Sequence, residues 1–380
     1  MLFWKRALLI NIVVVLVLLV GLTAFFATPW GRPALKTALL VPEVTPGFPV
    51  KPLEWVSKEP VVSEVNLQVD GKEIKADLYR PQDNKQHPAV VFTLGVVITR
   101  RNPAVTKFAQ ALTRSGFVVL VPDLPDFLSG FIWTDSLNSL ISSVEFLDRQ
   151  SFVQKNNIGF AGFCVGASIS IVASEDAKIR DKIAFIAAVS PYSNLFSLAE
   201  ATLLGRQKIK GEYVDWQPAE LTVETFNKGY VNFVATAEER ELILGKLMAS
   251  QTIPESEFEG LSPEAKSIYA FLANRDVAKF KELESNLPQG GRDLLVELSP
   301  DTNINNLKAK LFILSDKKDT FVPKIEGEKL AKMLPKKQVY FIEVDSFEHV
   351  NPATNLPRWS ALKQLFILSR YLYNVLNQIV

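Results

Sequence analysis

The chain has 380 residues and a formal net charge of +1 at pH 7, because 42 lysines and arginines nearly balance 41 aspartates and glutamates. Nucleic-acid binding, which needs a clearly basic surface, is therefore not favoured. The single cysteine excludes an internal disulfide framework and a cysteine-based zinc cluster, and we expect neither a metal nor an organic cofactor.

The N-terminal segment has the composition of a membrane anchor. Residues 7–27 contain no charged side chain, and about 20 apolar residues are enough to cross a bilayer as a helix. Lys5 and Arg6 precede this segment, which favours a cytoplasmic N-terminus and a main domain on the other side of the membrane. Phe25 and Phe26 make a poor signal-peptidase site. Residues 1–27 are thus expected to form a single-pass anchor, with secretion after signal cleavage as the alternative.

Residues 28–60 are expected to form a proline-rich connector, because prolines this dense disfavour long helices and central strands. From residue 61 onwards, predicted strands and amphipathic helices alternate, starting with two strands joined by an Asp70-Gly71 turn. Apolar runs with the composition of buried parallel strands occur at 88–94, 117–125 and 182–191. The pattern predicts an α/β fold with a mostly parallel sheet flanked by helices.

The alternation stops at about residue 192 and resumes near residue 307. The intervening stretch has the period and charge pattern of several short helices. Residues 192–306 are therefore interpreted as a helical cap inserted into an α/β domain that spans residues 61–380. A C-terminal helix closes the chain; Lys363 and Arg370 interrupt its apolar character, so it is expected to pack on the core rather than to cross a membrane.

The sequence Gly162-Phe163-Cys164-Val165-Gly166 holds the only cysteine, between a predicted strand and a predicted helix. This spacing is that of a nucleophile elbow, in which a strained turn presents the nucleophile and small neighbours let strand and helix approach each other. The helix N-terminus that follows favours the thiolate over the thiol. A buried structural cysteine is the alternative, but the two glycines favour a nucleophile.

A thiol nucleophile needs a base and a group that orients the base. His349 follows the last predicted strand, whereas His87 lies in a polar turn before a strand, so His349 is the expected base. Asp316 and Asp319 follow the strand at 310–315, and Asp319 is preferred because Asp316 stands very close to the strand. The order nucleophile, acid, histidine is that of an α/β-hydrolase triad.

Two backbone N–H groups are expected to form an oxyanion hole. One belongs to Val165, directly after the nucleophile, and the other to Val96 or Val97 in the loop after the strand at 88–94. Arg100 and Arg101 follow on the same loop. They are candidates for binding a substrate carboxylate, with solvated surface charge as the alternative.

Three pieces of sequence resemble the dienelactone hydrolase family of α/β-hydrolases: GFCVG at the elbow, SDKKDTFVP in the acid loop and FEHV at the histidine. The likeness covers roughly residues 62–190 and 307–380. It implies an α/β-hydrolase fold and a triad of Cys164, Asp319 and His349. Leu94, which stands where many α/β-hydrolases have a histidine, departs from the family pattern. So do the cap and the anchor, and the cap suggests a different, more apolar substrate pocket.

We therefore expect a membrane-anchored hydrolase that cleaves a carboxylic ester, lactone or thioester, small or lipid-like, through a thioacyl intermediate. A non-catalytic, membrane-tethered protein of the same fold is the first alternative. An acyltransferase with the same triad is the second. The oligomeric state does not follow from the sequence.

Overall fold

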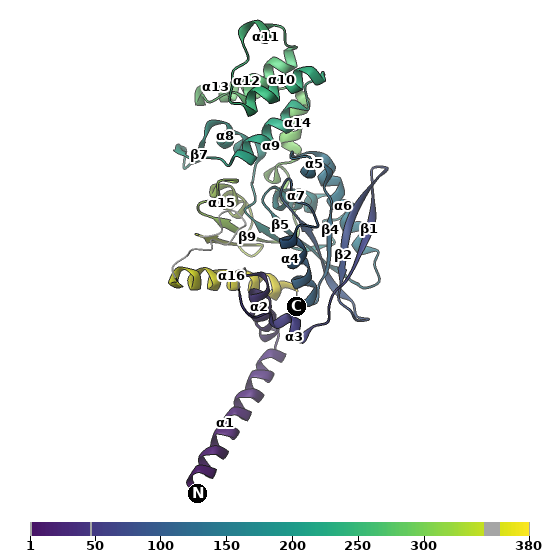
Figure 1. The fold of residues 1–380 in the computed structure, drawn as a ribbon, viewed down its shortest axis with the longest axis vertical. Coiled ribbons are helices and arrows are strands. Elements are labelled where there is room, and N and C mark those ends of the chain that lie inside the picture. The colour runs from purple at the N-terminus through teal and green to yellow at the C-terminus, as the bar shows by residue number, and fades with distance from the viewer. Residues whose placement is uncertain (1, 46–47, 346–357, 380) are drawn as a thin grey trace.

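The structure, a computed structural model, describes residues 2–45, 48–345 and 358–379. Its centre is an eight-stranded sheet in the order β1-β2-β4-β3-β5-β6-β9-β10 (Figure 1). β2 pairs antiparallel with β1 and with β4, whereas β4, β3, β5, β6, β9 and β10 are parallel to one another. The mostly parallel sheet expected from the sequence is confirmed. Its strands are β1 (Val61–Val69), β2 (Lys72–Arg80), β3 (His87–Thr93), β4 (Val118–Pro122), β5 (Val153–Phe163), β6 (Ile183–Val189), β9 (Lys310–Asp316) and β10 (Val339–Val344).

Helices cover both faces of this sheet, which explains the continuous apolar runs of the central strands. Along β3, Ala89 and Val91 pack into one core, and Val90 and Phe92 pack into the other. The first core is shared with α6 (Thr134–Asp148), α7 (Val165–Glu175) and α15 (Lys324–Met333). The second is shared with α4 (Pro103–Arg114) and α16 (Arg358–Ile379), while a short helix, α5 (Pro125–Leu128), follows β4.

The stretch between β6 and β9 forms a group of small helices at the end of the molecule opposite to the N-terminus (Figure 1). The helices expected in this stretch are present, and the sequence did not predict the hairpin that lies among them. Two strands pair antiparallel within it, and their turn has positive φ at Lys210 (51°) and Gly211 (93°), as two-residue hairpins require. The elements are α8 (Leu195–Leu204), β7 (Arg206–Ile209), β8 (Glu212–Asp215), α9 (Glu220–Val231), α10 (Ala237–Met248), α11 (Glu255–Glu259), α12 (Pro263–Leu272), α13 (Val277–Ser285), α14 (Gln289–Glu297) and the 3₁₀ turns η1 (Pro300–Thr302) and η2 (Ile304–Asn306).

Residues 28–60 contain more helix than their prolines suggested. A 14-residue helix, α2 (Gly31–Val44), and a short one, α3 (Pro52–Val56), lie within this stretch, so the expectation that it contains no long helix is wrong. Pro33 falls in the first turn of α2, where no intrahelical donor is needed, and Pro42 comes two residues before its end. Prolines near the ends of a helix are tolerated far better than prolines in its interior.

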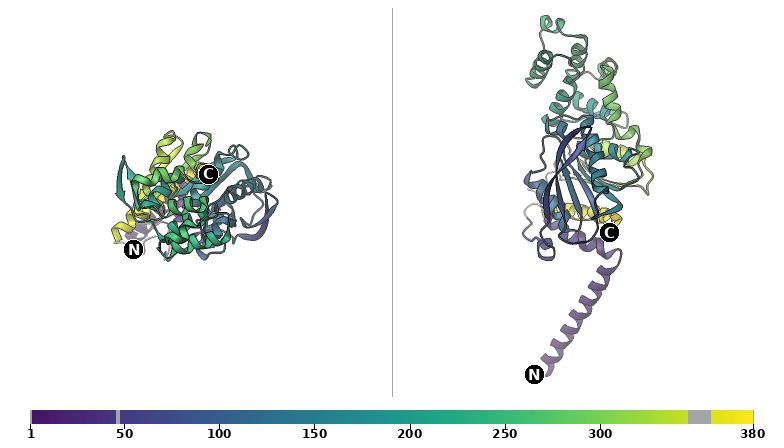
Figure 2. Two further views of the ribbon diagram at one scale, coloured as in Figure 1. Left: turned by 90° about the horizontal axis from the view of Figure 1, so that it is seen from above. Right: turned by 90° about the vertical axis from the view of Figure 1, so that its right-hand side faces the viewer.

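The first helix, α1 (Leu2–Ala27), leaves the domain beside α2 and extends away from it (Figures 1 and 2). Within the described part of the chain, no helix is long and apolar enough to count as a membrane span. The anchor expected in residues 1–27 is therefore not supported by the structure.

Candidate functional site

Cys164 lies on a strained turn between the end of β5 and the start of α7. Its backbone has φ 54° and ψ −133°, a conformation that residues other than glycine rarely adopt. Val97 and Ser190 also have positive φ and follow β3 and β6 at the same sheet edge. Backbone strain of this kind concentrates at functional sites, where the surrounding structure holds it in place. The strand–turn–helix context expected from the motif is present.

The glycines on either side of Cys164 are required by close packing. A Cβ atom at Gly162 would lie 2.6 Å from both Ala167 Cα and Thr93 Oγ1, and one at Gly166 would overlap the carbonyl oxygen of Leu94. Contacts this short do not occur between real side chains, so no larger residue fits at either position without displacing α7 or β3. The two glycines let the start of α7 sit directly against the ends of β3 and β5.

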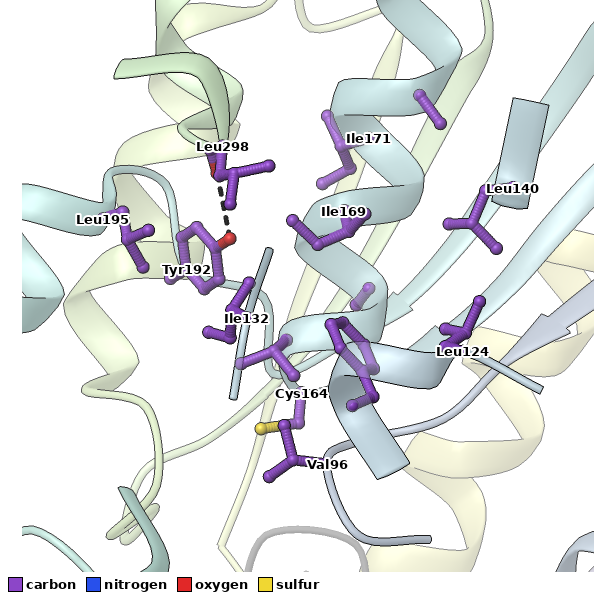
Figure 3. Close-up of a cluster of buried hydrophobic side chains, with 14 of the residues drawn as sticks. Val96, Leu124, Ile132, Leu140, Cys164, Ile169, Ile171, Tyr192, Leu195 and Leu298 are labelled. Atoms are coloured by element: carbon purple, nitrogen blue, oxygen red, sulfur yellow. Dashed lines mark hydrogen bonds between the residues drawn. The ribbon is translucent and has the colours of Figure 1, made fainter. Parts of the chain in front are cut away.

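The two backbone N–H groups expected to form the oxyanion hole have no acceptor in the described part of the chain. Among the described residues, neither the N–H of Val96 nor that of Val165 donates a hydrogen bond. The N–H of Val97 donates to the carbonyl oxygen of Phe127 at 2.8 Å, which removes Val97 as an oxyanion donor. Gly95 brings this loop close, because a Cβ there would be only 3.7 Å from Cys164 Cβ, and Figure 3 shows Val96 beside the sulfur.

Both candidate acids lie at this same edge of the sheet. β5, β6 and β9 are parallel neighbours, so residues at their carboxyl ends come together. Asp316 is the last residue of β9, and its Oδ1 accepts from the N–H of Lys318 at 2.9 Å. The Oδ1 of Asp319 accepts from Phe321 N at 2.7 Å and Val322 N at 3.1 Å. Both carboxylates are buried, and the geometry of the described residues does not choose between them.

The expected base, His349, lies outside the described residues, so its role stays a prediction. The other histidine is placed at the wrong end of the sheet. His87 is the first residue of β3 and pairs in register with Val153 at the start of β5, whereas Cys164 follows the end of β5. The ring of His87 contacts Asp83 Oδ1 at 2.7 Å and the carbonyl oxygen of Gly116 at 3.1 Å. His87 therefore has a structural role.

Arg100 is occupied by other charges. Its buried guanidinium binds three carboxylates, through Nε to Asp123 at 2.9 Å, through Nη1 to Asp77 at 2.5 Å and through Nη2 to Glu64 at 2.8 Å. Arg101 is largely exposed and shares Glu64 at 2.5 Å. With every guanidinium nitrogen of Arg100 paired, the structure gives no support to the expected binding of a substrate carboxylate by this arginine. The surface-charge alternative describes Arg101.

Tyr192 is a site residue that the sequence pattern did not single out. It follows β6 and is fully buried near Cys164, and its hydroxyl donates to the carbonyl oxygen of Leu298 at 2.9 Å (Figure 3). Burial, and secondarily the charge of the nearby Cys164, raise the pKa of Tyr192 well above its ordinary value. Ser168 Oγ accepts from Tyr192 N at 2.7 Å and donates to Tyr192 O at 3.1 Å, so this serine is used in holding the loop.

The surroundings of the sulfur are mostly apolar. Ile132, Leu195 and Leu298 are buried in the same core as Cys164 and Tyr192, and Figure 3 shows them on the Tyr192 side of the sulfur. The hydroxyl of Ser190 is an exception, being buried without a hydrogen-bond partner in the described structure. No group of three or more metal-ligating side chains occurs among the described residues.

The segment between β8 and the start of α9 is hydrogen-bonded to the loop that follows β9 and carries Asp319. Trp216 Nε1 donates to the carbonyl oxygen of Asp319 at 2.8 Å, and Ala219 N donates to that of Thr320 at 2.7 Å. Thr222 Oγ1 adds a bond to Phe321 O at 3.3 Å. Movement of the insertion is therefore coupled to the backbone that carries Asp319.

No family model matches the chain, and no curated protein matches it. Solved structures do match. A 2,6-dihydroxy-pseudo-oxynicotine hydrolase gives a TM-score of 0.50 at 15% identity, over 83% of this chain and 68% of that one. A puromycin-hydrolyzing peptidase of Mycobacterium tuberculosis gives 0.50 at 14%, over 87% of this chain and 41% of that one. An acylaminoacyl peptidase gives 0.50 at 13%, over 83% of this chain and 41% of that one.

The chain thus spans about two fifths of the length of each of these two peptidases. What the matches share with it is the fold, a mostly parallel sheet with helices on both faces. This is the α/β-hydrolase fold that the sequence predicted.

Proposed function

We propose that this protein is a hydrolase that cleaves a carboxylic ester, lactone or thioester with Cys164 as nucleophile, in the manner of the dienelactone hydrolase family. One observation carries the proposal. Cys164 sits on a strained strand-to-helix turn, and the backbone N–H groups of Val96 and Val165 beside it have no acceptor among the residues that the structure describes. A structural cysteine needs neither the strain nor the donors, whereas an acyl-transfer site needs both.

In the first half of the reaction, the Cys164 thiol gives its proton to His349 and the thiolate attacks the carbonyl carbon. The carbonyl oxygen gains negative charge, which the N–H groups of Val96 and Val165 stabilise. When the C–O bond (or the C–S bond of a thioester) breaks, His349 returns the proton to the leaving alcohol or thiol. The product of this half is a thioacyl enzyme.

In the second half, His349 takes a proton from water and the resulting hydroxide attacks the thioacyl carbon. The same two N–H groups bind the second oxyanion, the C–S bond breaks and the sulfur recovers its proton from His349. Asp319 is proposed to orient His349 and to stabilise its cationic form. The side chains around the sulfur favour an apolar acyl or alcohol group, consistent with a small aromatic or a lipid-like ester.

The test combines turnover with trapping of the intermediate. Cys164→Ala should lower hydrolysis of a p-nitrophenyl ester about 10³-fold or more, and His349→Ala should do the same. His87→Ala is the matched control, because the ring of His87 lies at the other end of the sheet. Its loss should change turnover by no more than a factor of about two, far less than the loss expected for Cys164→Ala.

Mass spectrometry of the rapidly quenched wild type should show an acyl group on the peptide that contains Cys164. Full activity of Cys164→Ala would refute the proposal. Turnover that yields mainly a transesterified product when an alcohol is added would make the protein an acyltransferase. Absence of any adduct or turnover on a broad ester panel would favour a non-catalytic binding protein.

We also propose that α1 attaches the protein to a membrane, with the N-terminus in the cytoplasm and the α/β domain outside it. Large apolar side chains of α1 are about half to two-thirds exposed: Ile12, Val13, Leu16, Val17, Val20, Leu22 and Phe25. Replacing Val17 and Val20 by lysine should release the protein from vesicles in a flotation assay, whereas Val296→Lys, at an exposed site on α14, should not. Retention of the lysine variant would contradict the proposal.

A further inference from the structure

The end of the domain from which α1 leaves carries large apolar side chains that are mostly exposed in the described structure. We call them the Trp patch. Its members are 56–85% exposed: Trp30, Trp55, Val56, Trp359, Leu362 and Phe366. They belong to α3, to α16 and to the residue that precedes α2, and α2 contacts α1, α3 and α16. Figures 1 and 2 show these helices together, far from α10–α13.

The exposed residues of α16 form a stripe opposite to its buried face. Tyr371, Val375 and Leu376 are buried against the sheet. Trp359, Leu362 and Phe366 are spaced by three and four residues, so they share one side of the helix. A helix of a water-facing domain normally places charged residues at such positions. Clustered exposed apolar residues mark a surface that contacts something else.

The chemistry of the Trp patch fits a phospholipid surface. Tryptophan is enriched where an apolar phase meets water, because its ring is apolar and its N–H is polar. The charged side chains that α2 and α16 expose in the described structure are all basic, namely Arg32, Lys363 and Arg370. Glu43 of α2 is buried and accepts from Leu53 N at 2.9 Å, and α3 adds one exposed acid, Glu54. The excess is positive, which complements anionic headgroups.

We propose that the Trp patch docks on the surface of a membrane that contains anionic phospholipids, with its tryptophans in the headgroup region. This inference rests on the proposed attachment through α1, with which the patch is continuous, and not on the proposed hydrolysis. Docking fixes the orientation of the enzyme. The inserted helices start from the carboxyl end of β6, the edge that holds Cys164, and they lie away from α1 (Figure 1). Docking would therefore hold the sheet edge with Cys164, and the inserted helices, on the side of the domain that faces away from the lipid surface.

The test uses the full-length protein in vesicles of phosphatidylcholine alone, or with phosphatidylglycerol at three parts in ten. Flotation first reports attachment. Phosphatidylcholine brominated near the headgroup then quenches tryptophans at that depth. Quenching should be strong in the anionic vesicles and should fall in high salt, since screening weakens surface charge interactions. A variant with Trp30, Trp55 and Trp359 replaced by phenylalanine should lose the larger part of the quenching.

Two control variants make the result specific. Trp216→Phe removes a buried tryptophan at the insertion and should leave the quenching unchanged. Lys363→Glu combined with Arg370→Glu should abolish the difference between anionic and neutral vesicles while the protein still floats. The phenylalanine substitutions keep an aromatic ring at each position, so they should leave no cavity and should not disturb the fold.

Each outcome has a distinct meaning. Protein that does not float overturns the attachment through α1, and with it the docking. Protein that floats with unquenched patch tryptophans overturns the docking and leaves the attachment in place. Protein that is dimeric in detergent, with the same tryptophans shielded from acrylamide, shows that a second copy covers the patch and also overturns the docking. Loss of esterase activity alone contradicts neither the attachment through α1 nor the docking of the Trp patch.

Discussion

The turn at Cys164 and the ion cluster at Arg100 follow neighbouring strands of one sheet, yet they are built on opposite principles. The turn holds Cys164 at a positive φ, and within residues 2–45, 48–345 and 358–379 the N–H groups of Val96 and Val165 find no acceptor. The cluster uses every guanidinium nitrogen of Arg100, on Asp123, Asp77 and Glu64, and no residue in it has a positive φ. The sequence offered both places as candidates for contact with substrate.

This is the difference that we expect between the proposed catalytic site and a cluster that stabilises the fold. Buried polar groups in a folded protein are normally satisfied, so an unused donor beside a strained nucleophile is costly unless a ligand completes it. A saturated ion cluster has no capacity left for a ligand. Four substitutions sharpen or break this contrast, from the largest expected effect to the smallest.

Gly166→Ala should have the largest effect. The new Cβ would overlap the carbonyl oxygen of Leu94, so α7 must move away from β3 and the elbow must open. We expect the free energy of unfolding to fall by about 4 kcal/mol or more, a range reserved for severe core defects, and esterase activity to vanish. Thermal unfolding and turnover measure this, and a variant with wild-type stability would show that the glycines do not hold the elbow.

Arg100→Ala should cost stability and leave chemistry intact. It leaves the buried Asp77 with only the Nε of Arg101 at 4.0 Å and removes one partner each of Asp123 and Glu64, for a loss of about 3 kcal/mol. Arg101→Ala is the matched control, because this exposed residue shares Glu64 and should cost less than about 1 kcal/mol. The KM for an anionic ester should not change in either variant, whereas the maximal rate falls in proportion to the loss of folded protein. A rise in KM for the Arg100→Ala variant alone would indicate that Arg100 binds the substrate after all.

Glu175→Gln tests whether an unpaired buried group is enough to mark function. Glu175 ends α7, the helix that begins at the elbow, and its Oε1 has no hydrogen-bond partner among the described residues. Burial, and then the charge of Asp301, raise the pKa of this carboxyl to about 9. No backbone strain accompanies it, so we expect turnover at neutral pH to be unchanged.

The pH dependence of stability should change instead. A folded-state pKa above the unfolded value means that the folded protein keeps a proton that the unfolded chain loses, so stability falls as pH rises from about 5 to about 9. Glu175→Gln removes this loss of stability at high pH. The melting temperature of the variant should therefore exceed that of the wild type, and the difference should grow as the pH rises toward 9. Glu241→Gln, at an exposed site on α10, is the control and should follow the wild type. Parallel curves for Glu175→Gln and the wild type would contradict the assignment.

Gly245→Ala should have the smallest effect and the opposite sign. Gly245 lies within α10 and a Cβ there meets nothing within 4 Å, so alanine should stabilise the protein by about 0.5–1 kcal/mol through helix propensity. Its comparison with Gly166→Ala isolates the packing effect from the general cost of glycine. A destabilised Gly245→Ala would mean that α10 is packed against something that the chain itself does not supply.

The sequence by itself determined the α/β class, the boundaries of most strands and the position of the elbow, because these depend on local patterns. Apolar runs mark strands buried on both faces, and two glycines flanking a cysteine mark a close approach of backbone to backbone. The expectations that failed did so because they ignored where a residue stands within a helix or a turn. The prolines of α2 stand near its ends, and the β7–β8 hairpin is marked only by Lys210-Gly211.

Only the tertiary structure decided which polar groups are used up. Whether Arg100 is free depends on Glu64, Asp77 and Asp123, which come from three separate strands or strand ends. The place of Tyr192 beside the sulfur depends on Leu298, more than a hundred residues further along the chain. Such contacts join residues that no local pattern links, because the sheet brings distant strand ends to one edge. Whether a buried polar group at that edge has all its hydrogen-bond partners therefore depends on every strand end that meets there.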